Sequence, residues 1–590
     1  MKSYVHGGSE VPLLFDTIGE RLRLAAKMHP EREAVVFKQE GVRKTYRELL
    51  ADQEGVRKTY RELLADSEAL ATGLIHLGLE KGDRLGIWAP NHYEWVVAHF
   101  ASALSGLVLV NVNPMYKSME LYYALHKVGV TALIMSAAFK RSNYYKILEQ
   151  NIPEIKRRPE GQGYVTHARN LPSLKHIIVF DEEDKAYRGA WKYTDVMQMG
   201  TKEDLQKLVE VEKSVQPDDP ANIQYTSGTT GSPKGATLTH HNIVNNAYFV
   251  GKRAKYHEER AVICIPNPLY HCFGSVLGMM CSVVHFQTMV CSSPAFEALA
   301  TLKAIDEEKC THIYGTPTMF IYLLNHPEFP QFNITSLKGG LISGAPCPEA
   351  LCARLVNDLG LKDLQPCYGT TECSPLMYCT YIHEPIEERN RTVGHIMDHL
   401  ESVLVDDEGN IVERGQQGEI LIRGYSVMRG YWDEDQKLRS TYMTNGWYKT
   451  GDIGMMHENG SVSIVGRSKE MIVRGGENIY PAEIEHFLMQ HTDIEDVQVI
   501  GVPDEKFGEV TCAWIRLHTG AELSELEIRE YCKAQIATCK IPTYILFKES
   551  HEFPMTVTGK VKKNEMREIS KKELGLEKVE SHFTRIATNA

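Results

Sequence analysis

A run of glycine and hydroxyl-bearing residues that ends in one lysine is the stretch of the sequence best suited to hold a polyphosphate. It comprises Thr226, Ser227, Gly228, Thr229, Thr230, Gly231, Ser232, Pro233, Lys234 and Gly235. Glycines let backbone N–H groups approach phosphate oxygens, hydroxyls donate hydrogen bonds, and the lysine adds a compact positive charge. The order differs from the Walker A loop, G-x-x-x-x-G-K-[ST]. A flexible surface turn is the alternative interpretation, which the lysine beside proline and glycine disfavours.

Polar residues farther along the chain could complete a nucleotide site around this loop. Glu372 is a hard oxygen ligand suited to magnesium, and Thr370 can donate a hydrogen bond to a phosphate. Asp452 can accept both hydroxyls of a ribose, and Arg467 adds a permanent positive charge. Lys560 follows a glycine, so its ammonium group can reach a phosphate from a flexible turn. Taken singly, each also has an ordinary explanation as a turn, capping or solvated surface residue.

In their order along the chain, these stretches resemble the motifs of the adenylate-forming superfamily, which includes acyl-CoA synthetases, luciferases and peptide-synthetase adenylation domains. The resemblance covers roughly residues 15–570. It implies that Lys560 catalyses adenylation, that Lys469 lies at the hinge of a rotating C-terminal domain, and that Gly475 and Gly476 line the path of CoA. The implied nucleotide-binding residues are residues 226–234 for the phosphates, Ser343, Gly344, Ala345 and Pro346 for adenine, Tyr368, Gly369, Thr370 and Glu372 for the α-phosphate and magnesium, and Asp452 and Arg467 for ribose.

Residues 261–290 contain no Asp, Glu, Lys or Arg. A buried α/β layer would explain this, but His271, Phe273 and several glycines interrupt the run, and we expect an apolar acyl pocket beside the phosphates. An amino acid substrate would need a buried carboxylate for its ammonium group, which the segment lacks. Plain aliphatic acids fit better, because each buried CH₂ contributes about 0.8 kcal/mol. The resemblance implies the medium-chain type of acyl-CoA synthetase, on stretches 267–272, 314–320 and 474–481.

The predicted function is a fatty acid–CoA ligase that uses ATP and Mg²⁺ to form an acyl-adenylate, releases pyrophosphate, and transfers the acyl group to CoA with release of AMP. A luciferase-like monooxygenase and a non-catalytic AMP-binding sensor are the alternatives. Two departures from the superfamily pattern lie near the expected nucleotide, His395 where many relatives have arginine and Lys449 where an aromatic residue is more familiar. Their effect on nucleotide affinity, the acyl chain length and the oligomeric state are left open.

Composition restricts the function classes. A net charge of -12 without a long basic run disfavours nucleic-acid binding, and the partners we expect are small molecules. The apolar runs are too short for a transmembrane segment. Thirteen scattered cysteines without a C-x-x-C pair suit neither a disulfide framework nor a zinc site. The resemblance implies mitochondria, but the first residues show no presequence pattern, so the cytoplasm is the alternative.

The elements that must position these residues alternate between strand and helix patterns from residue 67 onward, which predicts βα units around a mainly parallel sheet. A predicted hairpin at 403–412 and strands at 418–423 and 462–465 add antiparallel β structure. We therefore expect an α/β fold with a large N-terminal domain (1–466), a hinge (467–470), a small mobile α+β C-terminal domain (471–570) and a charged tail (571–590). Residues 39–52 recur letter for letter as 53–66, a tandem duplication of which we expect one copy to form an extra loop or lengthened helix.

Overall fold

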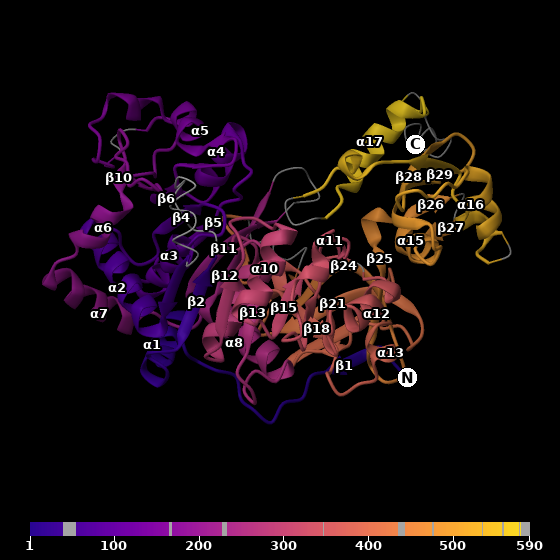
Figure 1. The fold of residues 1–590 in the computed structure, drawn as a ribbon, viewed down its shortest axis with the longest axis horizontal. Helices are drawn as coiled ribbons and strands as arrows, with labels where there is room; N and C mark the ends of the chain where they lie inside the picture. Colours follow the sequence, from indigo (N-terminus) through magenta and orange to yellow (C-terminus); the bar gives the residue numbers. More distant parts are fainter. Residues whose placement is uncertain are drawn as a thin grey trace.

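A computed structural model gives the arrangement of the chain (Figure 1). The structure describes residues 1–38, 55–164, 168–226, 233–345, 347–434, 443–474, 477–533, 535–556, 560–577 and 579. Two large sheets with helices on their faces form most of the molecule, a third, antiparallel sheet lies beside them, and a small domain at the C-terminal end occupies the upper right of Figure 1. The predicted α/β class with added antiparallel structure is confirmed.

The first large sheet carries the phosphate-loop strands at one side. Its strands run parallel from β10 to β11, β12 pairs antiparallel with β11, and β22 pairs antiparallel with β12. Residues 132–136 and 176–180 are buried on both faces, as expected where helices cover a parallel sheet. The strand order is β10 (Trp191–Lys192), β9 (His176–Phe180), β6 (Ala132–Ser136), β4 (Arg84–Trp88), β5 (Val108–Asn111), β11 (Pro220–Thr226), β12 (Lys234–Thr239) and β22 (Gly430–Tyr431).

The second large sheet holds the predicted acyl and adenine segments. It is parallel from β17 to β2, with antiparallel strands at both edges. The uncharged segment 261–290 forms β13, a π-helix η2 (Phe273–Met280), α9 (Cys281–Val284) and most of β14, and nearly all of it is buried. The strand order is β19 (His395–Ile396), β18 (Leu376–Cys379), β17 (Asp363–Gly369), β16 (Gly339–Ile342), β15 (His312–Gly315), β13 (Val262–Cys264), β14 (Thr288–Cys291), β2 (Glu33–Phe37) and β3 (Val56–Thr59).

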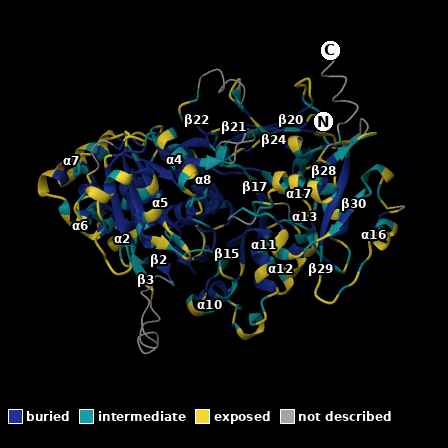
Figure 2. Cartoon of the chain, turned by 90° about the horizontal axis from the view of Figure 1, so that it is seen from above, coloured by how far each residue is buried: buried dark blue, intermediate teal, exposed yellow. Residues whose placement is uncertain are grey.

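Helices cover these sheets and present exposed outer faces, which Figure 2 shows in yellow around the dark blue strands. The helices of this region are α1 (Ile18–Met28), α2 (Tyr60–His76), α3 (Tyr93–Leu104), α4 (Ser118–Lys127), α5 (Tyr144–Asn151), α6 (Tyr193–Met199), α7 (Lys202–Ser214), α8 (His240–Arg253), α10 (Ala298–Glu308), α11 (Pro317–Leu324), α12 (Glu349–Asn357) and α13 (Ile386–Arg389). Along the described part of the chain, none of the helices is long and apolar enough to cross a membrane.

The second copy of the duplicated segment has a clear structural role. It provides β3 and the start of α2, where the Thr59 side chain accepts from the backbone N–H of Glu62 and the Glu62 carboxylate accepts from that of Thr59. This capping box fixes the point at which the strand ends and the helix begins. The whole first copy, 39–52, lies outside the described residues, so the expected extra loop or lengthened helix stays a prediction.

The antiparallel sheet positions the ribose motif. It contains β1 (Tyr4–His6), β20 (Leu400–Val405), β21 (Gln417–Gly424), β24 (Trp447–Met456) and β23 (Met443–Thr444), with β25 (Val462–Arg467) paired to β24. The predicted hairpin at 403–412 is confirmed, because Val405 pairs antiparallel with Ile411 and the backbone N–H of Val412 donates to the carbonyl of Leu404 across a turn at 406–410. The longer partner of β20 is β21.

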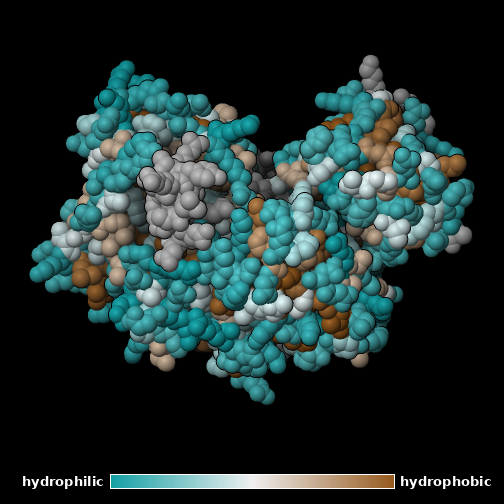
Figure 3. All heavy atoms as spheres, in the orientation of Figure 1, coloured by the Kyte–Doolittle hydropathy of each residue, from teal (hydrophilic) through white to brown (hydrophobic). Residues whose placement is uncertain are grey.

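The C-terminal region has its own sheet and apolar clusters. Its strands are β26 (Ile472–Arg474), β27 (Glu477–Ile479), β28 (Ile494–Asp504), β29 (Gly508–Leu517) and β30 (Tyr544–Phe547), and its helices are α15 (Pro481–Leu488), α16 (Glu525–Cys532) and α17 (Lys563–Glu573). The predicted start of a tail at 571 is wrong, because α17 continues to Glu573 and Leu574 and Leu576 pack on the apolar cluster beside β29. In the space-filling view, a notch separates this region from the larger body (Figure 3).

Candidate active site

The phosphate-loop lysine is held by a hairpin. β11 and β12 are antiparallel with Thr226 opposite Lys234, and the intervening residues 227–232 lie outside the described chain. Lys234 is 8% exposed, and its Nζ lies 4.9 Å from the ring centroid of Tyr431 on the neighbouring β22. Because α8 begins only after β12, no helix N-terminus directly follows the loop. The sheet therefore places one positive charge at the loop, where a Walker A site would add a helix dipole.

Tyr431 links this lysine to the predicted magnesium ligand. Its hydroxyl donates to Glu372 Oε1 at 2.9 Å, while its ring faces Lys234. Glu372 is in the short helix η4 (Thr371–Cys373), which follows β17. Just before it, the Thr370 hydroxyl oxygen is buried and has no hydrogen-bond partner in the described part of the structure. A buried hydroxyl without a partner is costly, and an incoming phosphate oxygen would satisfy it.

A magnesium ion fits this site only together with a nucleotide. Glu372 offers a carboxylate, but the described residues contain no cluster of three or more His, Cys, Asp or Glu side chains that could hold a metal ion. Mg²⁺ is commonly bound by one or two carboxylates, with substrate phosphates and water as its other ligands. The donor set matches that mode of binding.

Asp452 is fixed by two protein groups. It lies opposite Arg467 where β24 pairs with β25, and Arg467 Nε donates to its Oδ1 at 3.0 Å. The Tyr368 hydroxyl donates to its Oδ2. Burial, together with the negative charge of Asp452, raises the pKa of Tyr368 well above its ordinary value, so this hydroxyl remains a donor. A carboxylate has about four acceptor positions, so both oxygens of Asp452 can still accept from ribose hydroxyls.

Lys560 reaches the N-terminal part of the chain. The strand-like segment before α17 runs from the C-terminal region toward α11 in Figure 1. A Cβ added to Gly344 would lie 3.8 Å from Lys560 Cε, and Tyr322 of α11 contacts Ser550 through their hydroxyls at 3.2 Å. Lys560 lines a cavity of about 10 Å³ with Asn267, Pro268, His271, Phe273, Thr316, Met319 and Gly344. The C-terminal lysine and the uncharged segment therefore share one site.

The charges around Lys560 oppose each other. Burial lowers the pKa of its ammonium group, as does the positive charge of Arg467, while the charges of Asp452 and Glu372 raise it. Burial, with Lys560 nearby, lowers the pKa of His271 to about 3, so this imidazole is neutral near pH 7. The net lowering of the Lys560 pKa fits a lysine that awaits an anionic substrate.

The predicted acyl-pocket residues form a neutral wall. The backbone N–H of Phe273 donates to His271 Nδ1 at 3.3 Å, and the Phe273 ring stacks on buried Tyr314 with centroids 6.1 Å apart. A neutral imidazole and an aromatic surface suit an uncharged aliphatic chain, because neither presents a charge that the chain would have to desolvate.

The structure describes some of the remaining predicted site residues, and others lie outside the described chain. Gly344 has φ +92, a left-handed backbone that favours glycine, and it lies beside exposed Ala345. Gly369 ends β17, and Lys469 is exposed in the short helix η5 (Ser468–Glu470) between β25 and β26. The site residues that lie outside the described chain are Ser227, Gly228, Thr229, Thr230, Gly231, Ser232, Pro346, Gly475 and Gly476.

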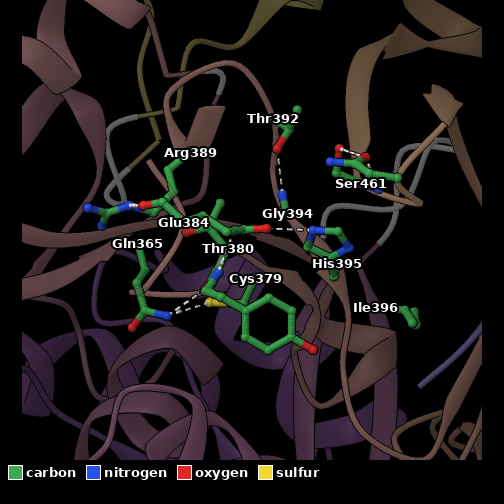
Figure 4. A network of polar contacts seen from close by, with 12 residues as sticks. Gln365, Cys379, Thr380, Glu384, Arg389, Thr392, Gly394, His395, Ile396 and Ser461 are labelled. Atoms are coloured by element: carbon green, nitrogen blue, oxygen red, sulfur yellow. Dashed lines mark hydrogen bonds and ion pairs between the residues drawn. The ribbon is translucent and has the colours of Figure 1, made fainter. Parts of the chain in front are cut away.

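The two departures from the family pattern have protein surroundings of their own. His395 Nε2 and Glu384 Oε1 lie 2.6 Å apart in a hydrogen bond (Figure 4). The ring centroids of Tyr381 and His395 are 5.3 Å apart. The backbone oxygen of His395 accepts from buried Arg253 at 3.2 Å. His395 thus helps to hold the edge strand β19, and Lys449 is exposed on β24.

Sequence reasoning missed several residues of the site. Tyr431 was overlooked because an R-G-Y-W stretch carries no chemical signature by itself. Asn267, Thr316 and Met319 lie in stretches that supported the resemblance, but no role was assigned to them. Their position directly after strands β13 and β15 was the available signal, because ligands bind at the carboxyl ends of parallel strands.

Comparisons with known proteins agree with this geometry. The AMP-binding enzyme family matches residues 22–432, and the AMP-binding enzyme C-terminal domain matches residues 483–560. The fold and the site define an adenylating enzyme, and the chain belongs to the AMP-binding enzyme family.

Individual relatives and a similar solved structure are named as CoA ligases. The chain is 44% identical to the medium-chain acyl-CoA ligase ACSF2, mitochondrial, of Danio rerio and 43% identical to that of Homo sapiens, over 97% of this chain and 91% of each relative. The crystal structure of the anthranilate CoA ligase AuaEII in complex with anthranoyl-AMP has a TM-score of 0.80 at 23% identity, covering 98% of this chain and 100% of that one, and supports the fold.

Proposed function

We propose that this protein is an ATP-dependent fatty acid–CoA ligase, with medium-chain acids as the preferred substrates. The observation that carries the proposal is the shared cavity of Lys560 and the uncharged segment at His271 and Phe273. The names of the relatives, which cover nearly the whole chain, support the same activity and chain length.

In the first proposed step, the fatty acid carboxylate attacks the α-phosphate of ATP, and pyrophosphate leaves. Lys560 and Thr370 stabilise the negative charge that develops on the α-phosphate, and Lys234 with the phosphate loop binds the leaving β- and γ-phosphates. Asp452 holds the ribose, the segment at Gly344 binds adenine, and the segment at Tyr368 holds the α-phosphate. Mg²⁺ bound at Glu372 would neutralise phosphate charge.

In the second proposed step, the thiol of CoA attacks the acyl-adenylate carbonyl and AMP leaves. Lys560 blocks part of the site that CoA must enter, so the C-terminal domain has to move between the steps. We propose residues 1–466 and 471–570 as the two moving bodies, with Lys469 in the hinge and Gly475 and Gly476 beside the CoA path. Lys469 is exposed and Glu470 contacts Lys563 at 3.5 Å, an interaction that rotation could break without disturbing a core.

The test is a pair of assays across saturated acids of four to eighteen carbons. Pyrophosphate release should require the acid, and AMP release should also require CoA, with the highest kcat/KM in the medium-chain range. Acid-independent binding of AMP without turnover would indicate the sensor, and oxygen-dependent light with a luciferin would indicate the monooxygenase.

We further propose a mitochondrial location, since the named relatives are described as mitochondrial. Imaging of the natural full-length protein with a C-terminal tag tests this, and a diffuse cytoplasmic signal would contradict it.

A further inference from the structure

A second cavity lies at the opposite end of the strands that carry the active site. Its volume is about 370 Å³. Arg32 precedes β2, Arg260 precedes β13 and Phe286 precedes β14, and these three strands are parallel. The cavity is therefore at their amino ends, whereas His271 and Gly344 of the candidate active site follow the carboxyl ends of β13 and β16. In Figure 1 the helices α1 and α8 beside it lie at the lower edge, away from the C-terminal region.

Arg21 of α1 and Arg32, which follows α1, both donate to backbone carbonyls at the end of α9 and in the turn after it. Arg21 Nη2 donates to the carbonyl of Val284 at 3.1 Å, and Arg32 Nη1 donates to that of Phe286 at 2.7 Å. Both side chains line the cavity. A guanidinium group has five N–H donors, and one donor of Arg32 is bonded within the described residues, which leaves donors for another acceptor.

Arg21 is the more informative of the two. It is 8% exposed, and its buried Nε has no hydrogen-bond partner among the residues that the structure describes. Its one carboxylate neighbour, Asp16, lies 3.5 Å from Nη1. A buried guanidinium N–H without an acceptor is costly, and an anion in the cavity would remove that cost.

The acidic residues of the lining already have basic partners. Glu259 pairs with Lys338 at 2.7 Å and Glu258 with Lys255 at 3.6 Å, and neither lysine is part of the lining. Asp16 offsets the charge of Arg21 in part, and the charges of Arg32 and Arg260 have no carboxylate partner among the described residues of the lining. The cavity should attract an anion.

Aromatic rings provide the remaining walls. Tyr248 stacks on His285 with ring centroids 5.3 Å apart, and His29 lies 5.0 Å from Phe286. Burial lowers the pKa of His285 to about 4, which leaves that ring neutral near pH 7. These rings suit a planar or apolar group attached to the anion.

We propose that this cavity binds a small phosphate monoester with a planar or apolar body. A phosphate monoester near pH 7 carries a charge of about -1.5 to -2 and three strong acceptor oxygens, which match several guanidinium donors better than the two oxygens of a carboxylate. The volume exceeds what inorganic phosphate needs, and the aromatic walls accommodate the rest of the ligand. The site is separate from the nucleotide site of the ligase.

The probe for this proposal is 1-naphthyl phosphate, followed by fluorescence anisotropy on the full chain. A non-hydrolysable acyl-sulfamoyl adenosine saturates the catalytic site, so that binding there does not contribute. We expect saturable binding, with 1-naphthoate at least tenfold weaker and 1-naphthol weaker still. Absence of saturable binding, or equal affinity for 1-naphthoate, would overturn the proposal.

Substitutions locate the binding. Arg32→Gln and Arg260→Gln should each raise the Kd at least tenfold; they are preferred to a change at buried Arg21, which could disturb folding. The matched control is Arg391→Gln, which removes an exposed arginine that pairs with Glu349 outside the cavity. Equal loss of affinity in the control, or none in Arg32→Gln, would show that the probe binds elsewhere and would refute the site.

Discussion

Lys234 and Lys560 supply two positive charges of the candidate site, and the protein holds them in different ways. Lys234 is buried on a strand paired on both sides, with Tyr431 against its ammonium group. Lys560 lies on a turn of the C-terminal region. Its backbone N–H donates to the Thr556 hydroxyl, and its backbone carbonyl accepts from the Thr556 N–H. A charge built into a sheet can serve every step, whereas the proposed domain movement would withdraw the charge of Lys560. The difference predicts that only one of the two half-reactions needs Lys560.

The largest expected effect is on Lys560. Lys560→Ala should slow adenylation about 10³-fold, because the charge that stabilises the transition state is lost. ATP–pyrophosphate exchange with a medium-chain acid measures this step. Lys562→Ala removes an exposed lysine of the same segment and serves as the control, which should retain nearly full exchange.

Lys234→Ala should reduce kcat/KM for ATP about 10²-fold, since one charged contact to the leaving phosphates is removed. The thioester-forming step from supplied acyl-adenylate should change little, because that substrate lacks the β- and γ-phosphates. Lys207→Ala on exposed α7 is the control. An unchanged kcat/KM for ATP in Lys234→Ala would argue against a phosphate role.

Tyr431→Phe should reduce kcat/KM about tenfold, because a hydrogen bond to a carboxylate worth about 1.4 kcal/mol is lost. Glu372 would be less well oriented, so the Mg²⁺ concentration needed for half-maximal rate should rise. ATP affinity measured with EDTA present should stay unchanged, since the ring still faces Lys234. Tyr431→Leu removes the ring as well and should weaken that affinity. Equal ATP affinity of the two variants would show that the ring contact with Lys234 has no role separate from the hydroxyl contact with Glu372.

The smallest expected effect concerns pH. Burial lowers the pKa of Lys560 in the folded protein, so its charge is present at low pH and is lost as pH rises through that lowered value. The kcat/KM of adenylation, which reports the free enzyme, should fall on the alkaline side below the ordinary lysine pKa of 10.5. Lys560→Arg should move that fall to higher pH. If Lys560→Arg leaves the pH dependence of kcat/KM unchanged, the alkaline fall belongs to another titrating group.

Much of this arrangement could be predicted from the sequence, because strand and helix patterns and ordered motifs are local features. The pattern at 84–88 became β4, and Asp452 and Arg467 proved to be strand neighbours. Tyr431 and the buried Arg21 could not be predicted, since their roles depend on contacts with residues far away in the chain. The hairpin at 403–412 could be predicted because its turn residues are adjacent in the sequence, but the pairing of β20 with β21 could not.

The measurement that tests the central claim most directly is thioester formation by Lys560→Ala from a supplied medium-chain acyl-adenylate and CoA. Lys560 acts only in adenylation on this account, so the variant should form acyl-CoA at a rate within about threefold of the unmodified protein, a difference below about 0.7 kcal/mol. A loss in the rate of thioester formation as large as the loss in pyrophosphate exchange, in a variant with an unchanged melting temperature, would contradict the different roles of Lys234 and Lys560.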